Sequence, residues 1–321
     1  MWKAELTTEA RLIETKPAPY AVVACSDKAQ LPFACIAVIT ASRHLDGLKA
    51  SLYVVAQGCS TAELEQALRF CRAQGADVTL IPFDEHQNIG DGHDYSHGHL
   101  SAGMFLRLYL DKLLPRHFEK VLYLDTDTMV VDSLKPLLEM DLGAKLFAAH
   151  ADRFLELHRK EHLAAYLDIN KLGCFNSGVM LFNWQKVLRE DFLKKTLALR
   201  GKPGFKYPDQ DMLNVAANGN WYWMDGKYNA TRYVVSAGEK PVIMHFVSLE
   251  KPWGANYYVR QLKYRRAYQA FVKGTPWESY IKPKTPVGWA IVAWEPVMWW
   301  QQRKVGRQWQ AMDRERARAA R

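Results

Sequence analysis

Short, continuous apolar runs alternate with amphipathic stretches over the first 150 residues. Uninterrupted runs of this length are typical of strands that are buried on both faces of a sheet. Four such strands are predicted: a run that ends near Ser26, followed by Leu52–Ala56, Asp77–Phe83 and Val121–Asp125. Their alternation with helical segments predicts an α/β fold with a largely parallel sheet that is covered on both faces.

The segments between these strands predict helices. Ser60 and Glu63 have the spacing of a capping box, and the amphipathic stretch that they open continues through Arg72 and stops at Gly75. A second helix is predicted for SAGMFLRLYLDKLL, which begins at residue 101 and is ended by Pro115. A loop rich in Gly, His and Asp separates the third strand from this helix.

Beyond residue 150 the pattern is less regular. Phe175–Trp184 predicts a strand that leads into a helix, and Pro208 predicts the first turn of a short helix, where acidic side chains are also favourable. Val242–Phe246 predicts a late strand. Because prolines become frequent after residue 277, we divide the chain into one large domain over residues 1–280 and a Trp-rich, basic C-terminal tail over residues 281–321.

Composition indicates the class of protein and its compartment. The chain of 321 residues is 49% hydrophobic and 24% charged, which is ordinary for a globular protein that buries a substantial core. The five cysteines are widely spread and form no CxxC pair, so they predict reduced thiols in the cytoplasm and not a disulfide framework or a zinc finger. No apolar stretch has the length of a signal peptide core or of a membrane-spanning helix, so we expect neither.

Charge is concentrated in the tail. The net charge is +9, and residues 301–321 contain seven Lys or Arg against Asp313 and Glu315. The rest of the chain is only mildly basic, which argues against a nucleic-acid groove across the fold. Four tryptophans precede the basic stretch, namely Trp289, Trp294, Trp299 and Trp300. Tryptophan beside Lys and Arg is the composition of an interfacial anchor on an anionic membrane surface.

The tail therefore predicts peripheral attachment at the inner face of the cell membrane, which fits a lipid-linked acceptor. We expect Pro296 to interrupt any single helix there. The alternative is that the tryptophans pack on the domain and the basic end is a disordered appendage.

The sharpest local feature is VLYLDTDTMVV, in which a predicted buried strand runs directly into Asp125 and Asp127. In open parallel sheets, ligands bind at the carboxyl ends of the strands. Two carboxylates at such an end can share a hard divalent cation whose other positions stay open for phosphate oxygens. The alternative for the pair by itself is a turn with two solvated aspartates.

A second enzyme class has the same local motif. In aspartate-nucleophile phosphatases an apolar strand is also followed by DxDxT, and in that reading Asp125 attacks phosphorus while Asp127 handles the proton. That motif usually opens the fold, whereas three strand–helix units precede it here. Asp209 and Asp211 are the only downstream acidic candidates, and they lie at a predicted helix start. A Mg²⁺-dependent phosphatase that uses Asp125 is therefore the alternative enzyme.

Two further groups gain meaning only from what lies near them in space. His245 leaves an apolar strand and can bind a metal through neutral imidazole, with Lys251 six residues later as a point charge for a diphosphate. By itself, a histidine in such a strand is more often a buried core residue. Asn176 and Ser177 at a strand entry offer donors for sugar hydroxyls, and Gly178 allows close backbone approach, although an ordinary turn would have the same residues.

The third group stands at the start of a short helix. Asp209, Gln210 and Asp211 are consecutive there, and one carboxylate suffices to cap the helix. The other polar side chains are then available to face a cleft.

A histidine-rich loop precedes the helix of residues 101–114. It contains His93, His97 and His99, but no fourth metal ligand is evident and the neighbours are typical of a flexible loop. A loop over the active site that contacts the acceptor or the donor is therefore preferred to a zinc site. The chain has no GxGxxG after the first strand and no GxxxxGK[ST], so dinucleotide and P-loop sites have no support.

Five motifs in this order resemble family 8 of the retaining glycosyltransferases, which includes bacterial lipopolysaccharide galactosyl- and glucosyltransferases and glycogenin. They are Ser26-Asp27-Lys28, the Arg107 helix that leads into VLYLDTDT, and then FNSGVMLFN, YPDQDMLN and HFVSLEKPW. Asp152, in HADR, lies near the sugar-contacting aspartate of the family. The resemblance covers about residues 18–255. It implies a GT-A-type nucleotide-sugar-binding fold with a mostly parallel central sheet, followed here by the amphipathic tail.

The resemblance also implies a hexosyltransferase that moves a sugar from a UDP-sugar to a glycan or lipid-linked acceptor and retains the anomeric configuration. Mn²⁺ or Mg²⁺ would be bound by Asp125, Asp127 and His245 and by both phosphates of UDP, and Lys251 would help to stabilise the leaving diphosphate. The residues implied to hold the nucleotide and the donor sugar are Asp27, Arg107, Asp152, Asn176, Ser177, Asp209, Gln210 and Ser248.

The resemblance leaves the chemical step open between two forms. In one, the departing phosphate deprotonates the acceptor on the same face of the sugar; in the other, Asp209 or Gln210 stabilises the cationic sugar. The chain departs from the family at Ser248, where glycine is usual, and after Asp27, where the usual aromatic residue is missing. A non-catalytic basic protein that binds membranes or nucleic acid on a degenerate scaffold is a further alternative, but such a protein would have lost the metal ligands, which are intact.

Overall fold

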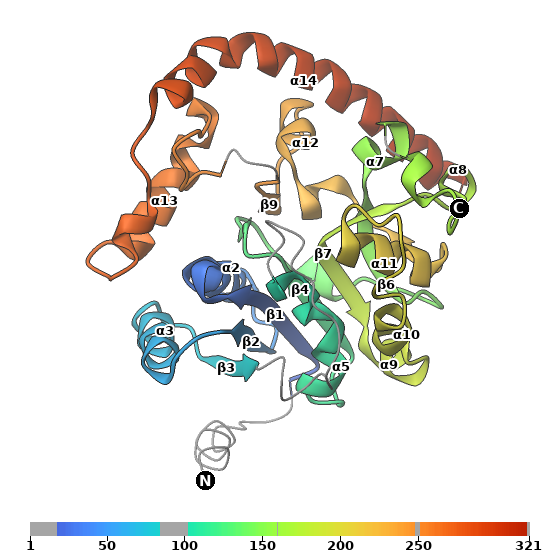
Figure 1. The fold of residues 1–321 in the computed structure, drawn as a ribbon, viewed down its shortest axis with the longest axis horizontal. Coiled ribbons are helices and arrows are strands. Elements are labelled where there is room, and N and C mark those ends of the chain that lie inside the picture. Colours follow the sequence, from blue (N-terminus) through green and yellow to red (C-terminus); the bar gives the residue numbers. More distant parts are fainter. Residues whose placement is uncertain (1–17, 84–101, 159, 248–250, 320–321) are drawn as a thin grey trace.

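A seven-stranded sheet forms the centre of the protein (Figure 1). The computed structural model describes residues 18–83, 102–158, 160–247 and 251–319. The strands, in the spatial order β3-β2-β1-β4-β7-β6-β8, are β3 (Val78–Phe83), β2 (Ala50–Gln57), β1 (Tyr20–Asp27), β4 (Lys120–Leu124), β7 (Phe175–Asn183), β6 (Phe147–Ala151) and β8 (Tyr222–Trp223). Neighbouring strands are parallel except where β7 pairs with β4 and β6. The mostly parallel α/β sheet that the sequence predicts is confirmed.

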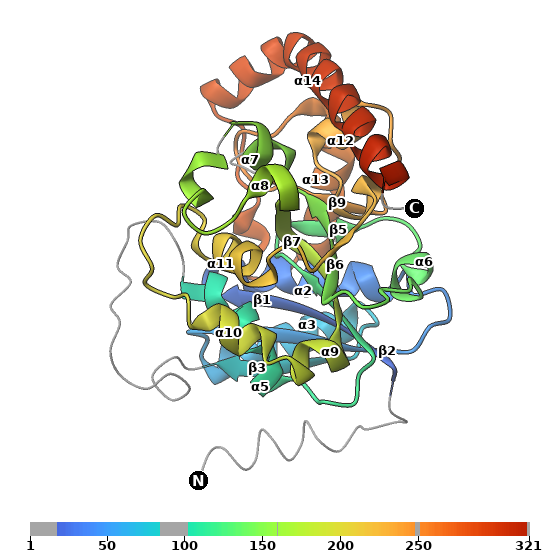
Figure 2. The ribbon, with the colours of Figure 1, turned by 90° about the vertical axis from the view of Figure 1, so that its right-hand side faces the viewer.

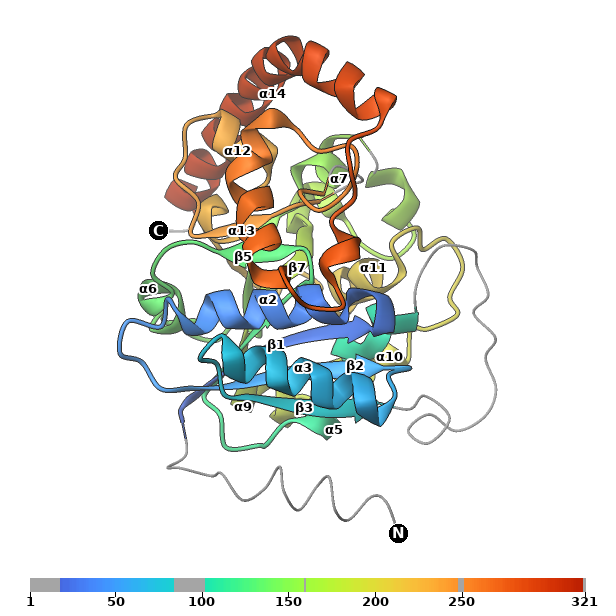
Figure 3. The same cartoon turned by 90° about the vertical axis from the view of Figure 1, so that its left-hand side faces the viewer.

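Helices cover both faces of this sheet. Along β1, Val22 and Ala24 pack on one face, and Val23 and Cys25 pack on the other, because successive side chains of a strand point to opposite faces. The first face is covered by α2 (Leu31–Ser42) and α3 (Thr61–Ala73), which lie in front of the sheet in Figure 3. The opposite face is covered by η2 (Ala102–Tyr109), α5 (Leu110–Leu113), α9 (Trp184–Arg189), α10 (Phe192–Leu197) and α11 (Pro208–Ala217).

The local helix signals are confirmed in part. The capping box is present, since the Ser60 side chain accepts from Glu63 N and Glu63 reaches back to Ser60 N, and α3 follows it. The helix predicted from residue 101 is instead a 3₁₀ segment, η2, that is followed by the short α5 before Pro115. Helix α2 is absent from the prediction because every residue from Leu31 to Ala41 is buried, so the helix has no polar face to reveal its period.

A second, two-stranded sheet joins distant parts of the chain. It pairs β5 (Thr128–Val130) with β9 (Ile243–His245) in antiparallel register, with Thr128 opposite His245. The pairing continues in a hydrogen bond of 2.9 Å from Phe246 N to Asp127 O. This small sheet therefore carries the predicted histidine to the carboxyl end of β4.

Shorter elements complete the body. They are η1 (Lys28–Gln30), α6 (Lys135–Leu138), α7 (Arg153–His158), η3 (Lys160–Leu163), α8 (Ile169–Leu172), η4 (Gly226–Asn229), α12 (Arg232–Ser236), η5 (Val259–Gln261), α13 (Leu262–Val272) and η6 (Glu278–Tyr280). Figure 2 shows α7, α8 and α12 stacked above the sheet, between it and the C-terminal helix.

The C-terminal segment is one helix, α14 (Pro286–Ala319), that arcs over α12 to α7 and α8 (Figure 1). The expectation that Pro296 interrupts any single helix here is wrong. Pro296 removes one backbone donor, but the helix is held beside it by Glu295, whose carboxylate accepts from the backbone N–H groups of Val259 and Arg260. Among the described residues, no helix combines the length and apolarity needed to cross a bilayer.

Candidate functional site

The two predicted carboxylates lie where β4 ends. Asp125 donates its backbone N–H to Gly178 O on β7 at 2.8 Å, and Asp127 follows immediately before β5. His245 reaches the same point from β9. One ligand atom from each of the three side chains lies within 4.8 Å of the others. The structure therefore brings Asp125, Asp127 and His245 together from positions up to 120 residues apart, as predicted.

Asp125 is oriented by two buried side chains. Its Oδ1 atom accepts from an Arg107 guanidinium nitrogen and from the Tyr123 hydroxyl, each at 2.7 Å. Arg107 also donates to the backbone oxygen of Ser177 at 2.8 Å and lies over the Tyr123 ring. With Oδ1 held in this way, the other oxygen, Oδ2, faces His245 Nε2 at 3.9 Å.

Asp127 is the more strongly paired carboxylate. Its Oδ1 atom is 3.2 Å from His245 Nε2, and its Oδ2 atom contacts the Lys251 ammonium. Burial by itself would raise the pKa of Asp127, but His245 and Lys251 outweigh it and hold the pKa below its usual value. Asp127 is therefore an anion at neutral pH, as a cation ligand must be.

The proton on His245 is placed by an asparagine. His245 Nδ1 is 2.7 Å from Asn229 Oδ1, which can only accept, so Nδ1 carries a proton and Nε2 is the ring nitrogen that faces the carboxylates. The ring lies close to the backbone of β7, where a Cβ on Gly178 would come within 2.1 Å of His245 Cε1. Glycine at position 178 thus makes room for the imidazole.

A chain of amides connects this histidine to the other side of the site. Asn229 Nδ2 donates to Asn176 Oδ1 at 2.9 Å, and Asn176 Nδ2 donates to Gln210 Oε1 at 3.3 Å. Gln210 Nε2 donates in turn to Asp152 Oδ2 at 3.1 Å. Backbone N–H groups of Ser177 and Gly178 fix the orientation of the Gln210 and Asn176 amides. Every amide in the chain therefore has one defined orientation from His245 to Asp152.

Asp209 is buried at the first turn of α11. Its Oδ2 atom forms an ion pair of 3.2 Å with Arg107 Nε. Burial raises the pKa of Asp209 from its ordinary value of 3.8 to about 6, while Arg107 opposes the shift and Asp125 adds to it. Burial also raises the pKa of Asp152. The helix start is thus not a simple cap, since its first carboxylate points into the site and pairs with the arginine that orients Asp125.

The remaining predicted residues lie in different places. Asp27 ends β1, the neighbour of β4, and its carboxylate accepts from Gln30 N at 3.0 Å, so it caps η1. Asp211 turns away from the site and binds His162 and the backbone N–H groups of Lys206 and Tyr207. Ser248 lies outside the described residues, as does the histidine-rich loop with His93, His97 and His99.

Sequence reasoning missed Tyr123 and Asn229. Tyr123 precedes Asp125 by two residues, so the strand alternation that places both on one face was available as a signal. Asn229 stands at the end of η4 in an irregular segment and belongs to no motif. Only the tertiary structure places it between His245 and Asn176.

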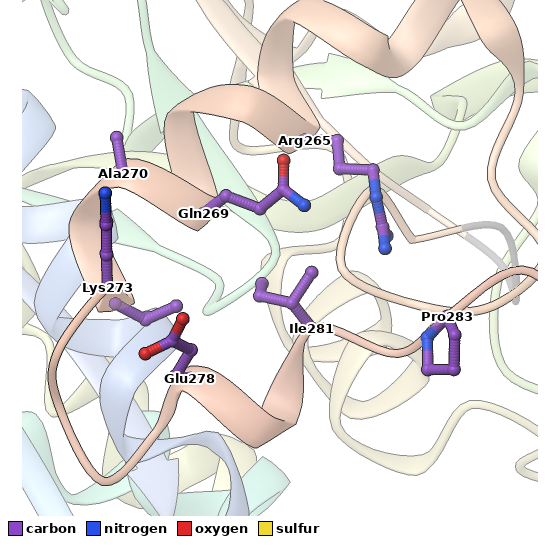
Figure 4. A pocket seen from close by; sticks show the side chains of 8 residues that line it. Arg265, Gln269, Ala270, Lys273, Glu278, Ile281 and Pro283 are labelled. Atoms are coloured by element: carbon purple, nitrogen blue, oxygen red, sulfur yellow. The ribbon is translucent and has the colours of Figure 1, made fainter.

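A cavity of about 350 Å³, which none of these residues lines, lies between α13 and the segment of residues 281–283 (Figure 4). Its lining includes Arg265, Lys273 and Glu278. Arg265 donates to the backbone oxygens of Pro252, Gly254 and Lys282. Because its guanidinium is used to hold these chain segments together, the cavity has a structural explanation.

The three predicted ligands fit a divalent cation. His245 Nε2 lies 3.2 Å from Asp127 Oδ1 and 3.9 Å from Asp125 Oδ2, so the three side chains offer one nitrogen and two oxygen ligands around a single point. Two carboxylates and one imidazole can bind a divalent cation and leave some of its coordination positions open.

Comparisons with known proteins identify relatives of this chain. Residues 21–257 match the family model described as Glycosyl transferase family 8. The chain is 22% identical over 276 residues to general stress protein A of Bacillus subtilis, covering 75% of this chain and 93% of that protein. It is 27% identical over 196 residues to lipopolysaccharide 1,2-glucosyltransferase of Escherichia coli K12, covering 56% of each.

Solved structures share the fold. The crystal structure of the galactosyltransferase LgtC in complex with donor and acceptor sugar analogs has a TM-score of 0.67 and 23% identity, covering 81% of this chain and 99% of that one.

A further relative, a putative glycosyltransferase of Haemophilus influenzae, is 24% identical over 65% of this chain and 63% of its own length. The chain thus spans somewhat over half the length of two of these curated relatives.

Proposed function

The chain belongs to glycosyl transferase family 8, and from that premise we propose that it moves a hexose from a UDP-sugar to a glycan or lipid-linked acceptor with retention of the anomeric configuration. The observation that carries the proposal is the convergence of Asp125, Asp127 and His245 at the carboxyl end of β4, with Lys251 beside them. This is the edge of a parallel sheet at which a nucleotide is expected.

Asp125, Asp127 and His245 would hold the divalent cation, Mn²⁺ or Mg²⁺. When bound, the cation would supply positive charge for the phosphate oxygens of the donor and so stabilise the leaving diphosphate. Lys251 already contacts Asp127 and adds a second positive charge at the same place. Asp27, at the end of the adjacent β1, would contact the nucleoside.

The donor sugar would lie against the chain of amides. Asp152, Asn176 and Gln210 present fixed donors and acceptors there, and Arg107 with Asp209 closes one side. Ser177 contributes by anchoring both Arg107 and Gln210 through its backbone. Preorganised polar groups of this kind orient a sugar without reorganisation during the reaction.

In the reaction, the acceptor hydroxyl oxygen bonds to the anomeric carbon while the bond from that carbon to the diphosphate breaks. The hydroxyl proton passes to the departing diphosphate on the same face. In the other form of the reaction, the Gln210 amide oxygen would stabilise the cationic sugar directly. That oxygen, Oε1, already accepts from Asn176 and from the Ser177 backbone, which favours proton transfer to the diphosphate. Gln210 is then a positioning residue, and Asp209 balances the charge of Arg107.

The alternatives are weaker. For the phosphatase, Asp125 would have to act as a nucleophile, yet one of its oxygens is held by both Arg107 and Tyr123. A non-catalytic scaffold would not preserve three converging ligands and their supporting hydrogen bonds. Neither alternative accounts for the family match over residues 21–257.

We further propose that α14 attaches the enzyme to an anionic membrane at the inner face of the cell membrane. Trp289, Trp294 and Trp300 expose 63%, 64% and 67% of their surface, and Val287 and Val297 are also exposed. Exposed tryptophans next to a basic stretch favour an anionic leaflet, where a lipid-linked acceptor would be found. The free thiols are compatible with the cytoplasmic side.

The test of the transferase is release of UDP from a panel of UDP-sugars with Mn²⁺, with and without chelator. The proposal expects release from one sugar, lost with chelator and lost in Asp127→Ala. Asp132→Ala is the matched control, because Asp132 lies just beyond β5 and its carboxylate pairs with the exposed Lys240 ammonium at 2.8 Å. Absence of release across the panel, together with Mg²⁺-dependent cleavage of a simple phosphate ester, would instead establish the phosphatase.

A further inference from the structure

The last turns of α14 end against the donor-sugar side of the site. Asp313 and Arg316 are three residues apart on α14, and Arg153 and Glu156 are three residues apart on α7, so each helix presents one acid and one arginine on one face. Arg153 Nε donates to Asp313 Oδ1 at 3.0 Å, and Arg316 donates to Glu156 Oε1 at 3.0 Å. We refer to Arg153, Glu156, Asp313 and Arg316 as the clasp.

The clasp is needed because its α7 half is buried. The Arg153 side chain is fully buried and that of Glu156 nearly so. Arg153 has five N–H donors, of which Glu156 engages one nitrogen, while Asp313 engages Nε and the other. If the Asp313 carboxylate were removed with α14 still in place, the two guanidinium nitrogens that it binds would be buried without this acceptor, which is costly for an arginine.

Both ends of the α7 half touch residues of the proposed sugar site. Arg153 follows Asp152, and Glu156 N donates to Asp152 O at 3.0 Å. Glu156 Oε1, the atom that Arg316 binds, also accepts from Cys174 N at 3.1 Å, two residues before Asn176. The carboxylate of Glu156 therefore adds a second link, beside the backbone hydrogen bond of 3.0 Å from Asp152 N to Cys174 O, between Asp152 and the start of β7, which are the two supports of Gln210.

An aromatic ring and two glycines hold the helix in register. The guanidinium groups of Arg153 and Arg316 both lie over the Trp223 ring, at 5.1 Å and 4.2 Å from its centroid. A Cβ on Gly306 would come within 2.2 Å of Tyr233 O, and one on Gly288 within 2.4 Å of Ala255 O. These glycines are five turns apart, so one face of α14 lies backbone to backbone on the body at both points.

We propose that Asp313 and Arg316 are positioning residues for the donor sugar, acting through Arg153 and Glu156 on Asp152 and Gln210. The C-terminal helix is on this view part of the active-site support and not a separable tail. The inference rests on the proposed transferase function, because only the sugar, and not the UDP part of the donor, would meet the groups that the clasp aligns.

The test compares Asp313→Ala and Arg316→Ala with Arg314→Ala, an exposed arginine in the same turn of α14. Two quantities are measured in the full chain: the dissociation constant of UDP with Mn²⁺, and kcat/KM for release of UDP from the UDP-sugar that the wild type uses. We expect kcat/KM to fall about 10- to 100-fold in the clasp variants, as misplacement of about 1 Å would cause, with UDP affinity within about twofold of wild type. Arg314→Ala is expected to match wild type in both.

A second variant avoids the charges altogether. Gly306→Val would move α14 away from α12, and the same loss of kcat/KM with unchanged UDP affinity is expected. Unchanged kcat/KM in all three variants would overturn the inference, and so would a parallel loss of UDP affinity and kcat/KM, which marks a purely structural role. If the wild type releases no UDP from any sugar, the proposed function fails, and with it the inference that rests on it.

Discussion

His245 Nδ1 and Asn229 Oδ1 are 2.7 Å apart, and this hydrogen bond decides which nitrogen of the histidine faces Asp125 and Asp127. The same asparagine donates to Asn176 and so joins the metal side of the site to the sugar side. Hydrogen bonds to the outer nitrogen of a ligating histidine fix its tautomer and orientation.

Asn229→Ala is therefore expected to weaken Mn²⁺ binding about 10- to 100-fold, the usual effect of losing a partner of a metal ligand. Calorimetric titration with Mn²⁺ measures it. Asn183→Ala is the control, because Asn183 caps α9 at the other end of β7. Equal affinities in the two variants would contradict the role given to Asn229.

The raised pKa of Asp209 predicts a pH-dependent stability. Its native pKa is about 6, above the ordinary value of 3.8, so the folded state binds this proton more tightly than the unfolded state. The stabilisation is complete below pH 3.8 and is lost as pH rises through 6, by about 3 kcal/mol. The side chain in Asp209→Asn cannot ionise. In urea unfolding with chelator, the free energy of unfolding of the variant should therefore rise relative to that of the wild type as the pH increases from 4 to 7. If the free energies of unfolding of the two proteins changed in parallel with pH, the pKa of Asp209 would not be raised.

Metal binding predicts a stability that depends on Asp127. Mn²⁺ at 100 times its dissociation constant stabilises a one-site protein by about 2.7 kcal/mol. Thermal unfolding should show this gain in wild type and in Asp132→Ala and not in Asp127→Ala. A gain of the same size in Asp127→Ala would place the cation elsewhere.

Gly178→Ala tests the close contact between β7 and the histidine. The added methyl group would lie 2.1 Å from His245 Cε1, so the imidazole must move, at a cost of about 1–3 kcal/mol in the free energy of unfolding. Gly226→Ala is a milder comparison, because its Cβ would lie 3.1 Å from His150 Cε1. In urea unfolding, Gly178→Ala should have a lower free energy of unfolding than Gly226→Ala. Only Gly178→Ala should lose Mn²⁺ affinity.

The outer face of α14 predicts binding to anionic vesicles. Replacing Trp289, Trp294 or Trp300 with serine should weaken vesicle binding about tenfold for each exposed side chain, from the loss of about 1.5 kcal/mol of apolar burial. Trp299→Ser is the matched control, since Trp299 lies under Arg260 at 4.0 Å. Co-sedimentation with vesicles that contain anionic lipid measures the effect. Equal binding by all four variants would contradict the proposal that α14 attaches the protein to the membrane.

The sequence by itself was sufficient wherever the determining interactions are local or belong to an ordered set of motifs. The capping box of Ser60 and Glu63 forms from residues within one helical turn. The apolar run before Asp125 indicates a buried strand by its composition alone. The mostly parallel sheet follows from the alternation of strands and helices, which allows few topologies, and the family was inferred from the resemblance of five ordered motifs. The meeting of Asp125, Asp127 and His245 was predicted only through the resemblance, as spacing alone does not bring β9 to β4.

Only the tertiary structure decided the rest, because the interactions are made by residues that are distant in the sequence. Helix α2 is apolar on every side since it is buried on every side, so no periodicity marks it. Helix α14 continues through Pro296 because Glu295 binds the backbone of η5, and its last turns are fixed by Arg153, 160 residues before Asp313. Asn229 belongs to no pattern along the chain, and it acquires its role from the two side chains that the fold places on either side of it.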